Sequence, residues 1–155
     1  MDQTIAEKRA EFVAFMGQAL EGQGLSPISG RILGLLMFDG TARSFSDLAT
    51  DLGVSRGSVS INARTLIQRG LVEKFNVGGD RQDYFRVAAQ PYEALLAGIS
   101  ERMRHMSQTV GGIARSLPDS AAETRTRLSR FANFHASVSE GMEHAAKVFA
   151  ERFPR

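Results

Sequence analysis

The fold can be predicted from residues 45–87, FSDLATDLGVSRGSVSINARTLIQRGLVEKFNVGGDRQDYFRV. The spacing of apolar residues changes several times along this stretch, in an informative order. Apolar residues at helical spacing come first, stop at a glycine, and resume over a second and longer stretch. Two short runs rich in β-branched and aromatic residues then flank a Gly-Gly pair. This order predicts a helix, a tight turn, a second helix, and two strands joined by a hairpin.

The first predicted helix, residues 45–52, has signals at both ends. Ser44 is suited to the N-cap position and Asp47 to the positive helix start. Gly53 can take the left-handed conformation that ends a helix. Ser55 follows two residues later and can cap the next helix, so the turn is only three or four residues long and the two helices must cross steeply.

The second predicted helix, residues 56–69, separates an apolar face from a small polar face. Its inner residues are Val59, Ala63, Leu66 and Ile67. Its outward residues are Gly57, Ser60, Ile61, Arg64, Thr65 and Gln68. A helix in the DNA major groove needs small residues for close approach, hydrogen-bonding groups for base edges and apolar groups for thymine methyls. The residues that meet this specification are Ser58, Ile61, Asn62 and Thr65.

Charge favours the same interpretation. Between residues 55 and 70 there are three arginines, Arg56, Arg64 and Arg69, and no acidic residue, in a chain of net charge +2. These arginines would contact phosphates, which supply affinity and register rather than sequence choice. Residues 71–77 and 82–87 are predicted to pair as antiparallel strands. Arg81 at the hairpin tip is predicted to enter the minor groove, whose negative potential attracts a guanidinium.

Together these features predict a winged helix-turn-helix that binds double-stranded DNA. The predicted DNA-contacting residues are Ser44, Ser55, Arg56, Gly57, Ser58, Ser60, Ile61, Asn62, Arg64, Thr65 and Arg81. The alternative is a winged-helix protein-interaction module without specific DNA binding. The DNA-binding hypothesis is favoured because a turn marked by glycine, a helix face without acids and a basic wing tip occur together.

Helices are predicted on both sides of this segment. A helix over residues 4–20 begins with a capping box of Thr4 and Glu7. Ser26-Pro27 opens the next helix, and its apolar residues from Ile28 to Phe38 predict that it is the buried centre of the domain.

A different pattern begins at Pro91. Apolar residues from Ile99 to Leu117 are spaced 4, 3, 4, 3 and 4 positions apart, which is typical of a coiled-coil seam. Pro118 breaks this helix, and a second capping box, Ser120 with Glu123, starts another. Two long helices joined by a tight turn are predicted to form an antiparallel hairpin.

This hairpin leaves more apolar surface than one small winged domain can cover. A homodimer formed through the N- and C-terminal helices would bury it, and a monomeric bundle is the alternative. A twofold dimer would set two recognition helices about 34 Å apart to meet a pseudo-palindromic operator. We expect an N-terminal dimerisation helix over residues 1–24, a winged DNA-binding domain over 25–89 and a C-terminal dimerisation hairpin over 90–155. The fold class is mainly α with a small β-hairpin (α+β).

The sequence resembles the MarR-like winged-helix transcriptional regulators and, more closely, their GbsR-type branch. The strings that carry the resemblance are GLSPISGRILGLL at 24–36, DLA at 47–49, LGVSRGSVS at 52–60, RGLVEK at 69–74 and GDR at 79–81. The resemblance implies a cytoplasmic homodimer that represses genes, in this branch often genes for making or importing osmoprotectants. It also implies a small-molecule effector that relieves repression, which is choline in some members.

Composition excludes several other functions. With 43% hydrophobic and 23% charged residues the chain is that of an ordinary globular protein. The N-terminus has no apolar signal-peptide core and no stretch is long enough to span a bilayer, so we expect a soluble cytoplasmic protein without a membrane partner. The lack of cysteine excludes disulfides, thiolate metal sites, cysteine nucleophiles and thiol-based redox sensing.

Two enzyme-like patterns have simpler interpretations. Residues 53–57, GVSRG, match a nucleophile elbow around Ser55, but the preceding residues have helical spacing rather than forming the buried strand that an elbow requires. Glu140 and His144 are one helical turn apart, which supplies only two metal ligands. The expectation is therefore no enzyme, no catalytic residues, no metal and no cofactor.

Overall fold

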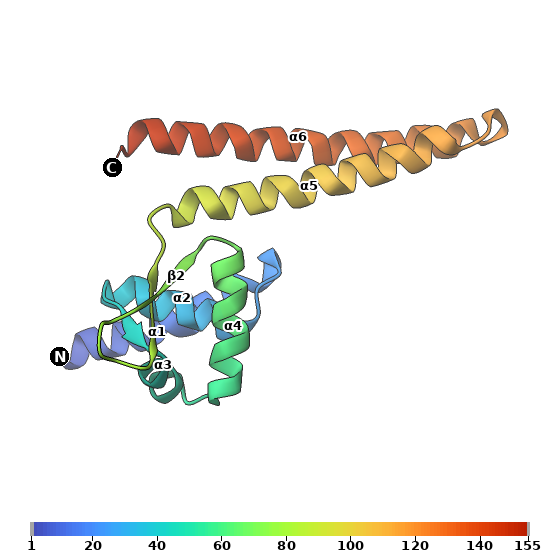
Figure 1. Cartoon of the computed structure of the whole chain (residues 1–155). Helices are drawn as coiled ribbons and strands as arrows, with labels where there is room; N and C mark the ends of the chain where they lie inside the picture. Colours follow the sequence, from blue (N-terminus) through green and yellow to red (C-terminus); the bar gives the residue numbers. More distant parts are fainter. Residues whose placement is uncertain (1, 155) are drawn as a thin grey trace. The chain divides into compact units, whose positions relative to one another are not determined.

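The computed structural model describes residues 2–154, and the chain divides into two compact units, the first ending at Pro91 and the second beginning at Tyr92 (Figure 1). The elements of the first unit are α1 (Gln3–Ala19), η1 (Glu21–Gln23), α2 (Pro27–Asp39), β1 (Arg43–Ser44), α3 (Phe45–Leu52), α4 (Arg56–Gln68), β2 (Val72–Asn76) and β3 (Asp83–Val87). The remaining elements are α5 (Pro91–Ser116), η2 (Asp119–Ala121) and α6 (Ala122–Arg152). Both η elements are single 3-10 turns. The predicted fold class, mainly helical with a small antiparallel sheet, is confirmed.

The sheet has three antiparallel strands in the order β1-β3-β2. β2 and β3 pair along their whole length, as predicted, and the chain between them is the tip of the wing. β1 adds a third strand that was not predicted: Arg43 lies opposite Phe85, and Ser44 lies opposite Tyr84. Because β1 leads directly into α3, this pairing attaches the start of the helix-turn-helix to the wing.

α2 forms the centre of the first unit. Ile32, Leu35 and Leu36 are each at most 1% exposed. The buried apolar residues that α3 and α4 contribute are Leu48, Leu52, Val59, Ala63 and Leu66. The prediction of a central helix is therefore confirmed, although Phe38 at its end is 36% exposed and packs against Phe12 of α1, with 6.0 Å between ring centroids.

The N-cap of α1 lies two residues before the predicted one. Asp2 is the N-cap residue, and its carboxylate accepts a hydrogen bond from the Thr4 amide at 3.1 Å. The predicted capping box of Thr4 and Glu7 is therefore wrong. A carboxylate supplies the same hydrogen bond as a threonine hydroxyl and adds a negative charge at the positive end of the helix, which explains why the earlier residue is the cap.

A cluster of charged side chains joins α1, α2, β1 and α3. Arg9 Nε donates to Asp39 Oδ1 at 2.7 Å, Arg9 Nη2 donates to Asp39 Oδ2 at 2.8 Å, and Arg43 also pairs with Asp39. Asp51 accepts a further bond from Arg9 at 3.2 Å. The hydrogen bonds from Arg9 are the main reason that the pKa of Asp39 falls from 3.8 to about 2, and burial opposes this change.

Asp39→Asn should destabilise the first unit by about 2 kcal/mol at pH 7, since each unit of pKa difference corresponds to about 1.4 kcal/mol. The folded state has the lower pKa, so the contribution of Asp39 is complete above about pH 5 and is lost as the pH falls towards 2. Urea unfolding of wild type and variant should therefore differ at pH 7 and converge near pH 2.

The control for this prediction is Glu11→Gln, which breaks an exposed ion pair with Lys8. Because such a pair is screened by solvent, the change should cost less than about 0.5 kcal/mol. A difference between wild type and Asp39→Asn that stays constant from pH 7 to pH 2 would show that the ionised carboxylate is not what stabilises the fold.

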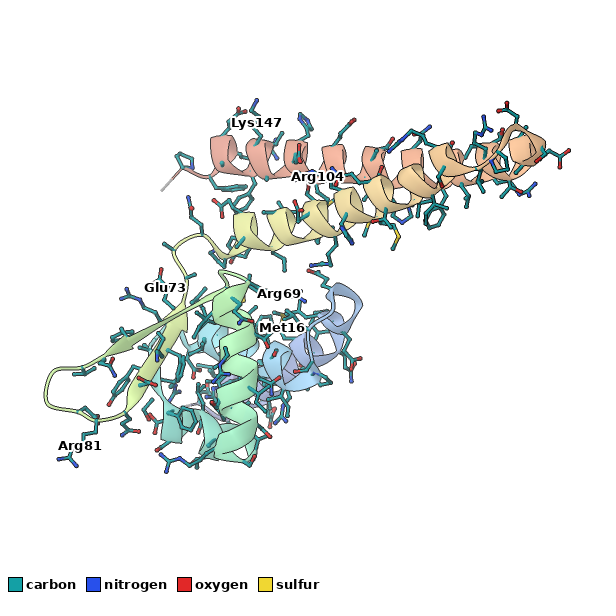
Figure 2. The ribbon with its side chains drawn as sticks, turned by 45° about the vertical axis from the view of Figure 1, so that its right-hand side comes forward. Met16, Arg69, Glu73, Arg81, Arg104 and Lys147 are labelled. Atoms are coloured by element: carbon teal, nitrogen blue, oxygen red, sulfur yellow. The ribbon has the colours of Figure 1, made fainter. Side chains whose placement is uncertain are left out.

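The second unit is an antiparallel pair of long helices that meet through small side chains. The buried residues of α5 and α6 are Ser100, Gly111, Ala114, Ala132 and Ser139. Ser100 Oγ and Ser139 Oγ lie 2.8 Å apart, and Arg104 pairs with Glu143 beside them (Arg104 is labelled in Figure 2). None of the helices within residues 2–154 has both the length and the apolar character needed to cross a bilayer.

The start of α6 differs from the prediction. Ser120 lies in the turn η2, Ala121 is the N-cap residue, and no side chain caps the helix, so the predicted capping box of Ser120 and Glu123 is wrong. Arg125 closes the turn instead, because its Nη2 donates to the Leu117 carbonyl and to the Asp119 carboxylate at 3.0 Å each.

Candidate nucleic-acid interface

Two serine caps and one glycine set the geometry of α3 and α4. At the start of α3, the Asp47 amide donates to Ser44 Oγ at 3.1 Å and the Ser44 amide donates to Asp47 Oδ2 at 3.3 Å. Gly53 ends α3 with φ at 62°, a conformation that glycine adopts without strain. Ser55 Oγ then accepts from the Ser58 amide at 3.1 Å and starts α4. The predicted caps and the short turn are therefore confirmed.

α4 turns a basic face to solvent. The exposed residues from its N-cap onward are Ser55, Arg56, Gly57, Ile61, Arg64 and Gln68. Ser60 and Thr65 are half-buried at the edges of this face. Within the described chain, neither Arg64 nor Gln68 makes a side-chain hydrogen bond or ion pair, so both can bind another molecule. We call these eight residues the α4 face.

Asn62, which was predicted to contact DNA, is turned towards α2. Its Oδ1 accepts hydrogen bonds from the hydroxyls of Ser26 and Ser29, the latter at 2.9 Å, and its amide nitrogen donates to the Ser58 carbonyl at 2.7 Å. The polar atoms of Asn62 therefore already have partners within the first unit. The reason is that the start of α2 carries two hydroxyls that need an acceptor, and Asn62 is the side chain of α4 within reach.

Two more polar side chains serve the fold. Ser44 is 3% exposed and its hydroxyl caps α3, so it does not lie on the outer surface as its predicted DNA contact would require. Arg69, predicted to contact phosphate, donates to the carbonyls of Gln23 at 2.7 Å and Gly24 at 2.9 Å (Figure 2). It therefore holds α4 to the turn that follows α1.

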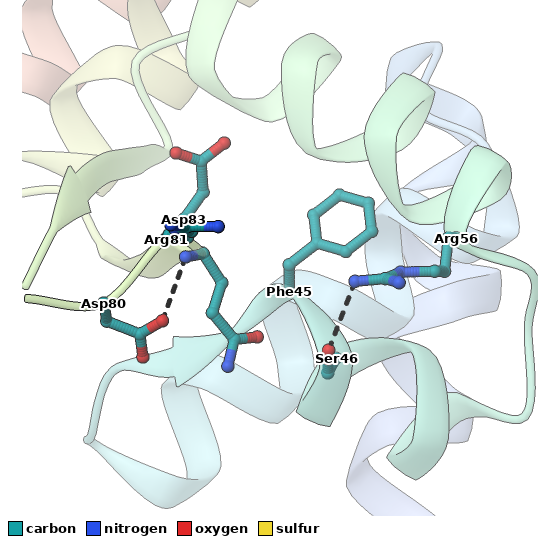
Figure 3. Close-up of a pocket in the computed structure, with 7 residues that line it drawn as sticks. Phe45, Ser46, Arg56, Asp80, Arg81 and Asp83 are labelled. Atoms are coloured by element: carbon teal, nitrogen blue, oxygen red, sulfur yellow. Dashed lines mark hydrogen bonds between the residues drawn. The ribbon is translucent and has the colours of Figure 1, made fainter.

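Arg56 is positioned by residues of α3 that were not predicted to matter. Its guanidinium lies over the ring of Phe45, 5.5 Å from the centroid, and Nη2 donates to Ser46 Oγ at 3.4 Å (Figure 3). An arginine held against an aromatic face loses less side-chain entropy when it binds a phosphate. The signal in the sequence was the pair Phe45-Ser46 at the first turn of α3, one helix before the arginine.

The tip of the wing is also organised by its own side chains. Tyr84 Oη donates to Asp80 Oδ2 at 2.8 Å, and the Gln82 amide donates to Asp80 Oδ1 at 3.0 Å. These bonds lower the pKa of the Asp80 carboxyl, with the Gln82 amide as the largest cause, and the bond to Asp80 raises the pKa of Tyr84. Arg81 is exposed, and its side chain extends away from the domain (Figure 2).

A cavity of about 430 Å³ lies between the wing tip and the helix-turn-helix. It is lined by Phe45, Ser46, Arg56, Asp80, Arg81, Gln82 and Asp83 (Figure 3). The structure therefore brings Arg56 and Arg81, which are 25 positions apart in the sequence, to one concave surface.

Tyr84→Phe should lower DNA affinity by roughly threefold, because it removes the hydrogen bond to Asp80 that orders the tip of the wing. The ring remains, so its contact with Phe75 at 6.0 Å and the strand pairing are retained. Binding of the same DNA by wild type and variant, measured by fluorescence anisotropy, checks this. Unchanged affinity with an unchanged melting curve would mean that the Asp80 contact does not order Arg81 for binding.

The serine of the elbow-like pattern and the histidines of the chain lie on different elements. Ser55 donates to Ser58 Oγ at 3.0 Å and caps α4, whereas His105, His135 and His144 all lie on α5 and α6. Ser55 therefore has no histidine in its own unit that could act as its base. Among residues 2–154 no group of three or more His, Asp or Glu side chains is arranged to hold a metal ion.

An exposed basic helix follows a short turn, and a hairpin beside it carries an exposed arginine without an ion pair among the described residues. This arrangement is that of a winged helix-turn-helix protein. The model of the MarR family matches residues 23–83. The chain is 36% identical over 146 residues to the HTH-type transcriptional regulator MmpR5 of Mycobacterium tuberculosis, an alignment that covers 92% of this chain and 87% of that protein. A crystal structure described as a transcriptional regulator is similar with a TM-score of 0.78 and 31% identity, over 93% of this chain and 99% of the other.

The chain therefore belongs to the MarR family. It is a DNA-binding transcriptional regulator with a winged helix-turn-helix, as predicted, in a family of regulators rather than of enzymes. The relative that supports this at 36% identity is MmpR5, and the assignment is to the MarR family as a whole rather than to its GbsR-type branch.

Proposed function

We propose that this chain is a homodimeric repressor that binds a pseudo-palindromic operator in double-stranded DNA, with α4 in the major groove and the wing in the minor groove. The observation that carries the proposal is the α4 face, which is exposed, free of acidic residues and flanked by the unpaired guanidinium of Arg81. Binding to another protein does not require this positive charge, whereas binding to DNA phosphates does.

The exposure of the α4 face and of Arg81 supports a revised set of proposed DNA contacts, which adds Gln68 and leaves out Ser44, Ser58 and Asn62. The proposed contacts are Ser55, Arg56, Gly57, Ser60, Ile61, Arg64, Thr65, Gln68 and Arg81. We propose that Ser44, Ser58 and Asn62 act indirectly, because each of them has its polar atoms bonded within the first unit. Arg56 and Arg64 would hold phosphates, and Arg81 would enter the minor groove next to them.

Dimerisation is supported by apolar side chains that one chain leaves in water. On α5 and α6 the exposed residues are Tyr92, Met106, Ile113, Phe131, Phe134 and Val148, and α1 adds Ile5 and Phe15. Met106 and Ile113 belong to the seam that sequence spacing predicts. Burying such a surface against a second copy would place two α4 helices on one side of the DNA, about one helical turn apart.

The finer assignments rest on the resemblance to the GbsR-type branch. That resemblance suggests a cytoplasmic repressor of genes for osmoprotectants, relieved by a small molecule such as choline. Calorimetric titration of the purified protein with choline and with betaine tests the effector. Heat of binding from either compound, together with release of bound DNA, would support it, and no heat from either would remove the osmoprotectant assignment while leaving DNA binding in place.

The experiment that tests the proposed function is selection of genomic DNA fragments on the purified protein at near-physiological salt, followed by sequencing. We expect retained fragments to share a pseudo-palindrome with half-sites about one helical turn apart. Retention without a shared motif would mean that the basic face binds phosphate only. A protein-interaction module would then be the better hypothesis.

A further inference from the structure

The hydrogen-bonding groups of α4 are largely used inside the molecule. Asn62 is bonded to the start of α2, and Ser58 Oγ accepts from Ser55. Thr65 Oγ1 donates to the Ile61 carbonyl at 3.2 Å. Four side chains of α4 were predicted to suit contacts with bases. Of these, Ser58, Asn62 and Thr65 already have hydrogen-bond partners within the molecule, and the fourth is Ile61.

Ile61 stands out from this face by its exposure. It is 67% exposed, the largest value among the exposed large apolar side chains of the described residues. Gly57 and Ser58, one turn before Ile61, are small and leave its side chain uncovered on that side, and Arg64 and Thr65 lie one turn after it. With about two thirds of its surface in water, Ile61 contributes little to the apolar core of the first unit.

We propose that Ile61 reads a thymine in each operator half-site by packing against its C5 methyl group. This inference rests on the proposed function and names the base that α4 selects. In the major groove only thymine presents a C5 methyl group, whereas cytosine has a hydrogen at that position. A branched aliphatic side chain can pack against the methyl group and would lose that contact over cytosine.

The size of the effect follows from the area of one methyl group. Removing a buried methyl from the contact should weaken binding about fourfold in one half-site, and about fifteenfold when both half-sites of a dimer are changed. Deoxyuridine is the suitable probe because it differs from thymidine by that methyl alone and keeps the same base pairing.

The test uses the full-length protein and the operator obtained by selection. Each thymine is replaced in turn by deoxyuridine, symmetrically in the two half-sites, and affinity is measured for wild type and for Ile61→Ala. For the wild type we expect one symmetric position at which affinity falls about fifteenfold. Ile61→Ala should bind the unmodified operator more weakly and should lose most of its sensitivity at that position. Arg127→Ala, on α6 and outside the proposed DNA contacts, is the control and should keep the sensitivity of the wild type.

Two results would overturn the inference while leaving the proposed function intact. One is a wild type that binds a defined operator without sensitivity to deoxyuridine at any position, which needs no variant to establish. The other is an Ile61→Ala variant that keeps the full sensitivity. If selection yields no shared motif at all, the proposed function itself fails, and an exposed Ile61 then indicates a protein partner. These failures are therefore distinguishable.

Discussion

Arg81→Ala should reduce the affinity for the selected operator by roughly a hundredfold, or about tenfold for each half-site of a dimer, because an arginine contact to DNA contributes about 1–3 kcal/mol. Arg81 is exposed and makes no ion pair within the described chain, so its loss should not disturb the fold. The hydrogen bond between Tyr84 and Asp80 holds the loop that carries Arg81. The loop should therefore keep its conformation in the variant, and the loss of affinity should come from the arginine side chain. Fluorescence anisotropy at fixed salt measures the change.

The matched control for this prediction is Arg127→Ala. Arg127 lies on α6, its side chain is 67% exposed, and its replacement changes the net charge by the same amount. Its effect on affinity should be less than about threefold, because a charge outside the proposed DNA contacts contributes only a screened, long-range attraction. Equal losses in the two variants would mean that net charge rather than the wing determines binding, and an unchanged affinity for Arg81→Ala would remove the wing from the interface.

Gly30→Ala should destabilise the first unit by about 3 kcal/mol or more. A Cβ at this position would lie 2.3 Å from the Met16 carbonyl oxygen and 2.9 Å from Gly17 Cα, where α1 crosses α2. Both are backbone atoms, so no side chain can rotate to make room, and the helices would have to separate. Overpacking of a core typically costs about 1–3 kcal/mol, and a clash with backbone lies at the upper end. The midpoint of urea unfolding measures this loss.

Gly57→Ala is the control in the same unit. A Cβ at Gly57 would lie 3.8 Å from Ser55 Oγ, which is ordinary van der Waals contact. Alanine is favoured over glycine in a helix by up to about 1 kcal/mol, so this variant should be as stable as the wild type or slightly more stable. If Gly30→Ala and Gly57→Ala unfolded at the same urea concentration, the close crossing of α1 and α2 would not be a determinant of stability.

Features whose partners lie close in the sequence could be predicted. Ser44 caps a helix through Asp47, and Ser55 does so through Ser58, so each cap needs a partner only three positions away. The hairpin pairs strands that are joined by one short turn. Two local predictions failed nevertheless, at the starts of α1 and α6, because several residues near a helix start can serve as its cap and the periodic pattern does not choose between them.

Features whose partners lie far away could not be predicted. Asn62 sits at the border between the inner and the outer face of its helix, and its side is chosen by Ser26 and Ser29, more than thirty positions earlier. The same is true of Arg69, which binds carbonyls of the turn after α1. A polar side chain at such a border turns towards whichever neighbour leaves a hydrogen-bonding group unpaired.

For this protein the sequence predicted the order of the long helices and of the two wing strands, the helix-turn-helix with its caps, the wing with Arg81 and the basic α4 face, but not the strand β1. Each depends on local propensities and periodicity, which a few neighbouring residues encode. The packed structure was needed to show that Asn62 and Arg69 form hydrogen bonds within the first unit and that Phe45 and Ser46 position Arg56. It was also needed to show that the lack of a side chain at Gly30 lets α1 pack closely against α2. Those contacts join groups that are distant in the sequence and meet only when the core is packed. The spacing of residues along the chain therefore does not predict them.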